Sequence, residues 1–424
     1  MSSSLAFQPT DTAPREPKAA WANESAWTDE AVLSETAAIA AGPLAAAANG
    51  IDQGTYPRDI LGSLGRAGAL GVHLERHGSR FGLSIAAMQA ASRACGATAF
   101  LMWAHDVCGL YLERSGNPAL TGALLDGHAA GATFGGTALS NPMKAFAGIE
   151  PMLLRARPVP GGYRVSGSLP WVSHIGPGQY CGATAEVIGA DDETSHEIMF
   201  LLRCDAPAEL RPCPHFSGME GTSTWGIRLD GYFVGQDDLI ADPARPFIGQ
   251  IRAAFILLQC GMGLGVAEGS LDGMLAVEET LGHVNQFLAD RPDEIAGELA
   301  ELRGRIMRLA QAPFDGATDY LIDVLDARAQ VSELALRASQ SALLHQGARG
   351  YLISAAPQRR IREAHFVAIV TPAIKHLRWE MARLSREVLP QAGGARAHEP
   401  GTHRRPRAVA AIPLPCLRAD LRRG

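Results

Sequence analysis

Lysine is almost missing from this chain of 424 residues and occurs only at Lys18, Lys144 and Lys375. No lysine follows a glycine, so a phosphate-binding loop of the GxxxxGK[ST] type is excluded. This removes the kinases and ATPases that depend on such a loop. The formal net charge of −6 provides no concentrated basic face, which predicts that nucleic acid is not a partner.

Cysteine is scarce, and its spacing excludes two common kinds of site. The seven cysteines are scattered and none forms a CxxC pair, so we expect neither a disulfide framework nor a zinc ribbon, and no metal site. His73 and His77 have the i, i+4 spacing of a metal-binding helix. Leu74 stands where a HExxH motif requires glutamate, which favours a structural role for both histidines.

Two further signatures are incomplete. Gly261, Gly263 and Gly265 partly match a GxGxxG dinucleotide-binding loop, but Val266 or Glu268 replaces the third small residue, depending on the register. We therefore expect these glycines to serve close helix–helix packing. No GxSxG nucleophile elbow is present, so the sequence gives no support for a serine hydrolase of that type.

Long apolar runs are also few. The longest, Ala253 to Ala267, contains Gln259 and falls short of the ~20 residues that a membrane span needs. The first residues lack the sustained apolar core of a signal peptide. We therefore expect no membrane span and a cytoplasmic protein.

The abundant residues divide the chain into three zones. Residues 21–130 are rich in alanine and leucine at helical spacing, and residues 131–245 alternate short β-prone runs with turn residues, as in an antiparallel meander or barrel. Helical periodicity returns over residues 246–390. This order predicts an α+β protein with a β domain between two helical domains, and disordered ends at residues 1–20 and 391–424.

Four segments carry a family resemblance. They are Gly135–Pro142 (GGTALSNP), Gly162–Ser173 (GYRVSGSLPWVS), Gly218–Gly226 (GMEGTSTWG) and Gly347–Tyr351 (GARGY). In this order they resemble the acyl-CoA dehydrogenase superfamily of flavoproteins, whose patterns read ALTEPxxGSD, YxxxGxKxWIT, GMRGTST and GGxGY. The resemblance implies an N-terminal helical domain, a central antiparallel β-barrel domain and a C-terminal four-helix-bundle domain.

The resemblance also implies a flavin between the β domain and the second helical domain. Leu139 and Ser140 would lie at the pyrimidine edge of the ring, Trp171 would cover one face, and Ser173 would hydrogen-bond near N5. The expected cofactor is FAD. The arginine that meets the pyrophosphate in the family has no clear counterpart here, which leaves FMN open.

The same resemblance predicts partners. Gly347 and Gly350 would belong to a loop that meets the flavin of a neighbouring subunit, which implies a homotetramer or homodimer. A small molecule is the expected substrate. A flavin reductase or an electron-transfer flavoprotein is the expected source or acceptor of electrons.

One departure from the family decides the expected chemistry. A dehydrogenase of this family removes a proton with a carboxylate, but the two known base positions hold Thr371 and Ile251. We therefore favour the family's flavin-dependent monooxygenases, which use reduced flavin and O2. Two alternatives remain: an acyl-CoA dehydrogenase with a relocated base such as Glu220, and a catalytically inactive binding or scaffold protein.

Oxygenase chemistry calls for a hydrogen-bond donor near the flavin, and histidine can serve. His174 follows the predicted flavin-binding serine and is the first candidate, ahead of His215, His345 and His365. Thr371 is expected to hydrogen-bond a ligand on the substrate side. The sequence does not identify the substrate.

Overall fold

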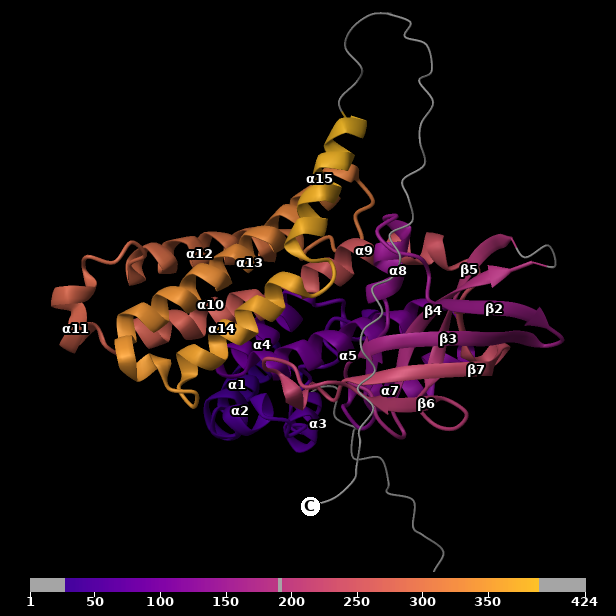
Figure 1. Cartoon of the computed structure of the whole chain (residues 1–424), viewed down its shortest axis with the longest axis horizontal. Helices are drawn as coiled ribbons and strands as arrows, with labels where there is room; N and C mark the ends of the chain where they lie inside the picture. The colour runs from indigo at the N-terminus through magenta and orange to yellow at the C-terminus, as the bar shows by residue number, and fades with distance from the viewer. Residues whose placement is uncertain (1–26, 190–192, 389–424) are drawn as a thin grey trace, which may run out of the picture.

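The computed structural model describes residues 27–189 and 193–388, which form helices at both ends of the chain and a sheet between them (Figure 1). The α+β class is therefore confirmed. The predicted disordered ends, residues 1–20 and 391–424, lie outside the described residues.

The N-terminal helices include one that is buried along almost its whole length. They are α1 (Asp29–Ile39), α2 (Ala45–Asp52), α3 (Arg58–Arg66), α4 (Phe81–Ala94), α5 (Gly96–Arg114), α6 (Pro118–Thr121) and α7 (Ala123–Ala129), with a π-helical turn, Ala40–Leu44, between the first two. Every residue from Gly96 to Leu112 of α5 is buried. A helix that is covered on all sides needs apolar residues all round, which is why α5 shows no polar face.

The central strands form one open, mixed sheet. The strands are β1 (Gly135–Thr137), β2 (Leu154–Val159), β3 (Gly162–Val172), β4 (Tyr180–Ile188), β5 (Thr194–Arg203), β6 (Glu209–Pro212), β7 (Trp225–Gly235) and β8 (Leu239–Ala241), and α8 (Ser140–Phe146) follows β1. Their order is β6-β7-β3-β2-β4-β5-β8, and β1 pairs with β4.

The predicted closed antiparallel barrel is therefore wrong. The strands β1 and β2 run parallel to β4, and within the described residues the edge strands β6 and β8 do not pair with each other. Both edges are short, with four residues in β6 and three in β8, and closure requires strands that continue around the ring. Alternating sequence patterns reveal strands but not which edges meet.

The C-terminal part is helical. Its helices are α9 (Ala244–Leu258), α10 (Cys260–Leu275), α11 (Glu278–Asn285), α12 (Pro292–Leu309), α13 (Thr318–Gln346), α14 (Ala356–Ile369) and α15 (Ile374–Val388). Added Cβ atoms at Gly263 and Gly265 would collide with Val331 of α13 and Ser92 of α4. The interpretation of these glycines as packing residues is therefore confirmed.

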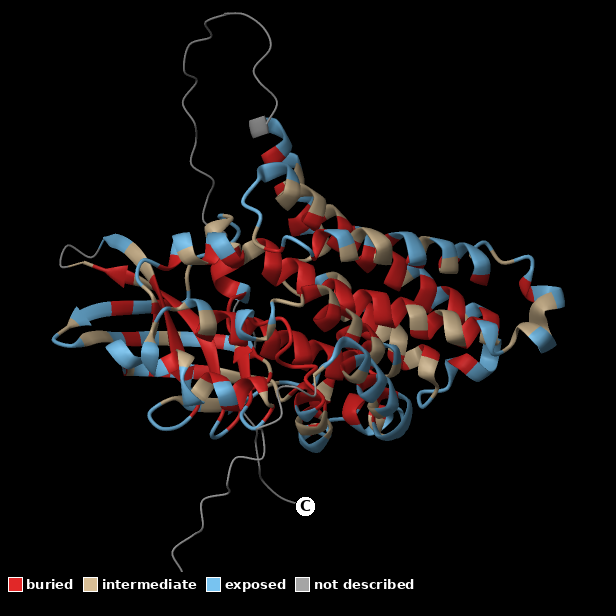
Figure 2. Cartoon of the chain, turned by 180° about the vertical axis from the view of Figure 1, so that it is seen from behind, coloured by how far each residue is buried: buried red, intermediate tan, exposed pale blue. Residues whose placement is uncertain are grey.

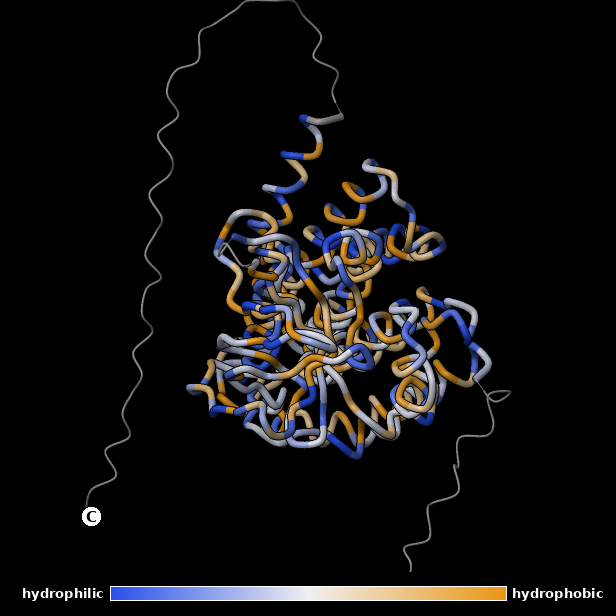
Figure 3. The backbone as a smooth tube through the Cα atoms, turned by 90° about the vertical axis from the view of Figure 1, so that its right-hand side faces the viewer, coloured by the Kyte–Doolittle hydropathy of each residue, from blue (hydrophilic) through white to orange (hydrophobic). Residues whose placement is uncertain are grey.

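The hydrophobic core is continuous from the sheet through α5 into the bundle, as the buried residues in Figure 2 show. A second core lies within the β part and includes Val165, Phe200 and Ile227. Helix α15 projects from the body, with polar and apolar turns alternating along it (Figures 1 and 3). The central strand β4 is covered on both faces, which explains why nearly all its residues are buried.

Two helical stretches have the length and apolar composition of a membrane crossing. One is Ala244–Leu275, longer than the apolar run noted in the sequence, and 83% of its apolar window is buried inside the fold. The other is Asp29–Asp52, of which 28% is buried. The first of these is the central helical stretch of the core.

Candidate functional site

The structure brings two of the predicted site residues into contact. Ser140 begins α8, directly after β1, and Thr371 lies between α14 and α15. Their hydroxyl oxygens are 2.8 Å apart, although 231 positions separate them in the chain. The predicted flavin edge and the predicted base position therefore meet where the sheet joins the bundle.

Buried polar residues hold Thr371 in place. The side-chain amide of Gln259 donates to the Thr371 carbonyl at 2.9 Å, and the Gln259 carbonyl accepts from Arg328 Nε at 3.0 Å. Arg328 is fully buried and also donates to the Val367 carbonyl at 2.6 Å. Ile251, at the other base position, is buried on α9. Neither base position offers a carboxylate.

Trp171 lies at the end of β3 with 49% of its surface exposed, so it is not a core tryptophan. Its ring meets Phe216 edge to face, with ring centroids 6.0 Å apart. Next to it, Ser173 Oγ is 2.7 Å from Thr224 Oγ1, which in turn is 2.9 Å from Thr222 Oγ1. An open aromatic face therefore stands beside a row of hydroxyl groups.

These residues fit a flavin. Such a ring needs an aromatic surface for its face and hydrogen-bond donors for its polar edge. Trp171 offers the first, and the hydroxyl groups of Ser173 and Thr224 can offer the second by turning from their bonds within the row. Leu139 is buried beside Ser140, and its N–H lies 3.3 Å from Thr137 Oγ1.

His174 lies inside the molecule. Its backbone is left-handed, with φ of 61°, and its ring is fully buried with Nδ1 3.2 Å from the Tyr56 hydroxyl. Burial lowers the pKa of His174 to about 3, so the ring is neutral near pH 7. Its proposed contact with an oxygen species stays a prediction, and it would have to be made from this buried position.

The other candidate histidines lie in different surroundings. His215 is exposed, and its Nδ1 is 3.7 Å from Glu220, the candidate relocated base. Glu220 Oε1 also accepts the N–H of Phe216, so this carboxylate belongs to the loop beside Trp171. His345 is buried on α13 and His365 is exposed on α14.

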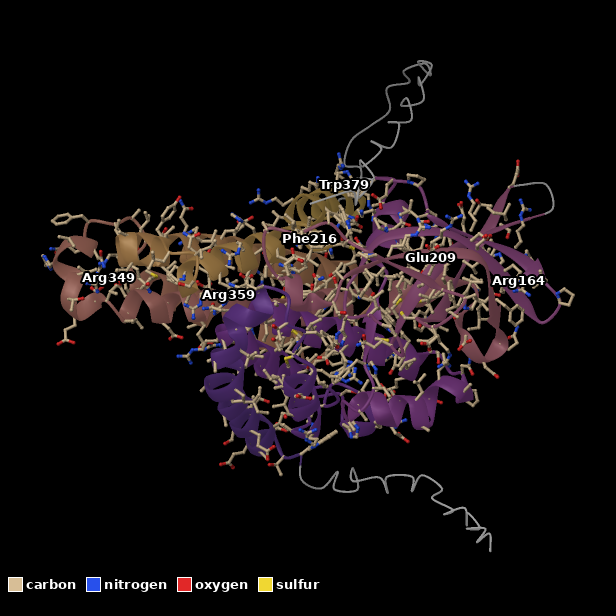
Figure 4. The ribbon with its side chains drawn as sticks, turned by 60° about the horizontal axis from the view of Figure 1, so that its bottom comes forward. Arg164, Glu209, Phe216, Arg349, Arg359 and Trp379 are labelled. Carbon is tan, nitrogen blue, oxygen red and sulfur yellow. The ribbon has the colours of Figure 1, made fainter. Side chains whose placement is uncertain are left out.

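Gly347 and Gly350 lie at the end of α13, in a 3-10 turn. Figure 4 shows Arg349 of this turn at one end of the molecule, Arg164 of the sheet at the other and Phe216 between them. Within one chain, these glycines are therefore remote from Trp171. A flavin that they contact would be bound by another copy.

Sequence reasoning missed a cavity of about 580 Å³ between α8, α9 and α15. Its lining includes Met143, Phe146, Arg252, Trp379, Glu380 and Arg383. Within this lining, Met143 stands about one helical turn after Ser140, and Arg252 directly follows Ile251 in the sequence. The arginines of α9 and α15 gave no local motif, because only the packing of these helices brings them together.

The charges in the cavity are unequal. Arg252 lies 3.0 Å and Arg383 2.6 Å from the Glu380 carboxylate. Burial alone would raise the pKa of Glu380, but hydrogen bonds and the charges of the two arginines outweigh it and lower that pKa. Glu380 is therefore an ionised carboxylate and a weak base. Arg245 also belongs to the lining, where its charge is paired with that of Glu197.

Comparison with known proteins agrees with this architecture. The family model "Acyl-CoA dehydrogenase, N-terminal domain" matches residues 28–132. A probable acyl-CoA dehydrogenase of Bacillus subtilis (strain 168) is 23% identical over 343 residues, which cover 75% of this chain and 87% of that protein.

Solved structures share the fold at low sequence identity. Butyryl-CoA dehydrogenase from Megasphaera elsdenii is 16% identical with a TM-score of 0.73, covering 90% of this chain and 100% of that one. Dibenzothiophene monooxygenase from Paenibacillus sp. A11-2 is 14% identical with a TM-score of 0.70, covering 85% and 98%. That enzyme has also been solved with FMN and indole.

The fold is thus that of the acyl-CoA dehydrogenase-type flavoproteins, in which helical parts enclose a central sheet. The resemblance to the acyl-CoA dehydrogenase superfamily that the four sequence segments predicted is therefore confirmed, by the family model over residues 28–132 and by the shared fold. Both dehydrogenases and a monooxygenase share its fold.

Proposed function

We propose that this protein is a flavin-dependent oxidoreductase that uses reduced flavin and O2 to oxygenate a small molecule. The observation that carries the proposal is Thr371, a threonine at the position of the family's base, with its hydroxyl 2.8 Å from that of Ser140. Ile251 fills the second base position, and Glu380, the carboxylate in the cavity, is held ionised by arginines. None of these three can readily abstract a proton.

The flavin, FAD or FMN, would supply the redox chemistry, with one oxygen atom entering the substrate and the other leaving as water. Trp171 would cover one face of the ring, while Ser173 and Thr224 would hydrogen-bond its polar edge. Ser140 and Thr371 would close the edge nearest the bundle. The substrate would occupy the cavity after α8, where the excess of arginine favours a molecule with an anionic group.

The first test separates oxygenase from dehydrogenase. Purified chain is reconstituted with FAD and, separately, with FMN, and then mixed without oxygen with acyl-CoA thioesters of several lengths. We expect the flavin to keep its absorption in this oxygen-free mixture. In a separate aerobic assay, we expect an oxygenated product only when reduced flavin is supplied. Rapid bleaching by a thioester would contradict the proposal and favour the dehydrogenase, and failure to take up any flavin would favour the scaffold.

The variant Thr371→Glu provides the matched comparison, because it returns a carboxylate to the family's base position. Bleaching that occurs only in this variant would mean that thioesters reach the site and that the natural chain lacks the base. Bleaching of the natural chain at the same rate as the variant would mean that another residue acts as the base.

A second prediction concerns Trp171. Trp171→Ala removes the exposed aromatic face, so we expect flavin to bind about tenfold more weakly or worse, measured by fluorescence titration. Phe233→Ala is the control, since Phe233 is 42% exposed on the same sheet and its ring packs against Arg164. Equal binding by the natural chain and Trp171→Ala would exclude Trp171 as a flavin contact.

We further propose a homodimer or homotetramer. Near Gly347 and Gly350, the end of the bundle carries exposed apolar side chains, including Phe287, Tyr351 and Ile353. Such a group of residues is typical of an interface. A flavin reductase or an electron-transfer flavoprotein as redox partner, and a cytoplasmic location, remain proposals that rest on the sequence.

A further inference from the structure

Three histidines are buried together between the N-terminal helices and the sheet. His105 lies on α5, His128 on α7, and His174 follows β3; all three are completely buried. The rings of His105 and His128 stack with centroids 3.5 Å apart and an interplanar angle of 4°. The ring of His174 meets that of His105 edge-on, with centroids 5.8 Å apart.

The hydrogen bonds of His105 and His128 fix where their protons lie. His105 Nε2 is 2.9 Å from the His128 carbonyl, and His128 Nε2 is 2.9 Å from the His105 carbonyl. A carbonyl only accepts, so each Nε2 carries hydrogen. Burial lowers the pKa of both rings well below the usual value, so each Nδ1 is bare.

One of these two bare nitrogens has a partner and the other does not. His128 Nδ1 is 2.9 Å from the Tyr180 hydroxyl, which can donate to it. His105 Nδ1 is buried without a hydrogen-bond partner. His105 therefore presents an acceptor to which nothing donates.

His174, in contrast, has a buried N–H that lacks an acceptor. The Tyr56 hydroxyl accepts from Gln179 Nε2 at 2.9 Å and lies 3.2 Å from His174 Nδ1, to which it can donate its own proton. The neutral ring of His174 then carries its hydrogen on Nε2. This Nε2 is also buried without a partner. His174 therefore has an N–H without an acceptor, and the neighbouring ring of His105 has a bare nitrogen without a donor.

We propose that His174 Nε2–H donates to His105 Nδ1 through one buried water, and that this link makes His105 a positioning residue for Ser173. Burying a donor and an acceptor without hydrogen-bond partners lowers stability, so a hydrogen-bonded link between the two nitrogens is favoured. The result is a hydrogen-bond chain with one direction, from Gln179 through Tyr56 and His174 to His105.

The link to Ser173 comes from the backbone. His174 adopts a left-handed conformation, which is uncommon for residues other than glycine and needs support from its surroundings. Its N–H donates to the Thr222 carbonyl at 2.9 Å, and its ring is anchored by Tyr56 and, in this proposal, by His105. Ser173 immediately precedes it and bonds Thr224 at 2.7 Å. This second half of the inference rests on the proposed flavin site.

The hydrogen bond itself is tested without flavin. In chain labelled with 15N-histidine, NMR near pH 7 reports which ring nitrogen carries hydrogen. We expect His105, His128 and His174 all to be neutral with hydrogen on Nε2, and the His174 signal to change in His105→Phe. Hydrogen on Nδ1 of His174, or a His174 signal that does not change in His105→Phe, would overturn the proposal.

The positioning role is tested by a pair of variants. In His105→Asn the side-chain oxygen can accept near the position of Nδ1, whereas His105→Phe offers no acceptor. We expect flavin to bind about tenfold more weakly to the Phe variant and within about twofold of the natural affinity to the Asn variant. Thermal unfolding, measured in parallel, shows whether each variant is folded.

His73→Phe is the control for general damage, because His73 is equally buried among the N-terminal helices and bonds the Asp106 carbonyl at 2.8 Å. It should lose stability but keep its flavin affinity. Equal weakening by His73→Phe and His105→Phe would overturn the positioning role. If the natural chain binds no flavin, the proposed function fails while the NMR result still decides the hydrogen bond.

Discussion

Acidification from pH 7 to pH 5 is expected to lower the free energy of unfolding by several kcal/mol. Burial lowers the pKa of His73 to about 4 and of His174 to about 3, and it lowers the pKa values of His105 and His128 well below 6.5. Below pH ~6.5 the unfolded chain protonates these rings and the folded chain does not. The contribution of these neutral rings to the free energy of unfolding is therefore fully present above pH ~6.5 and is lost as the pH falls.

Two buried acids act in the opposite direction. Burial raises the pKa of Asp106 well above its usual value and also raises that of Glu363, so the folded chain retains protons that the unfolded chain has released. The histidines with a lowered pKa, which also include His376, outnumber these two acids, so the unfolded chain binds more protons than the folded chain below pH ~6.5. Each proton of difference changes the free energy of unfolding by about 1.4 kcal/mol per pH unit, so stability should fall as the pH falls.

Urea unfolding at a series of pH values measures this slope. His105→Phe provides the comparison, because removing one of the four rings should reduce the slope by about 1.4 kcal/mol per pH unit. An unfolding free energy that is the same at pH 7 and pH 5 would contradict the expectation. It would mean that the histidines are charged in the folded chain or are accessible to water.

Gly136→Ala is expected to cost about 3 kcal/mol of stability and to weaken flavin binding by tenfold or more. Gly136 lies in β1, and a Cβ atom there would stand 2.5 Å from the Ser173 carbonyl oxygen and 3.3 Å from that of His174. Both obstacles are backbone atoms, which cannot rotate away as a flexible side chain does. The segment that carries Ser173 would have to move.

Urea unfolding and flavin titration of the same preparation measure both effects. Gly297→Ala is the matched control, because no atom lies within 4 Å of an added Cβ at this position of α12. Alanine in an open helical position should stabilise the chain by up to about 1 kcal/mol. A Gly136→Ala variant with natural stability and affinity would show that the contact between β1 and Ser173 is not required.

Much of the architecture was predictable from local patterns. Helical spacing and β-prone runs depend on near neighbours in the chain, so the order of helices, sheet and helices followed from the sequence. Whether a sheet closes depends on edges that are far apart in the chain, and within the described residues β6 and β8 do not pair. The barrel prediction failed for that reason.

The site was predictable in part. Ser140 and Thr371 were both chosen by resemblance to the family, but their contact across 231 positions became visible only in the fold. The arginine-lined cavity and the histidine cluster follow no local spacing. Arg252 and Arg383 come from two helices, and His105, His128 and His174 come from three separate elements. Such groups form by tertiary packing, which a single sequence does not reveal.

The contact between Ser140 and Thr371 has a consequence for biosynthesis. A ribosome completes the sheet long before it reaches Thr371, so a nascent chain can form the face that carries Trp171 while the opposite wall is still missing. Under the proposed function, capture of the flavin would then be one of the last events of maturation. A truncated product that ends before Thr371 would leave the face proposed to bind the ring open to water.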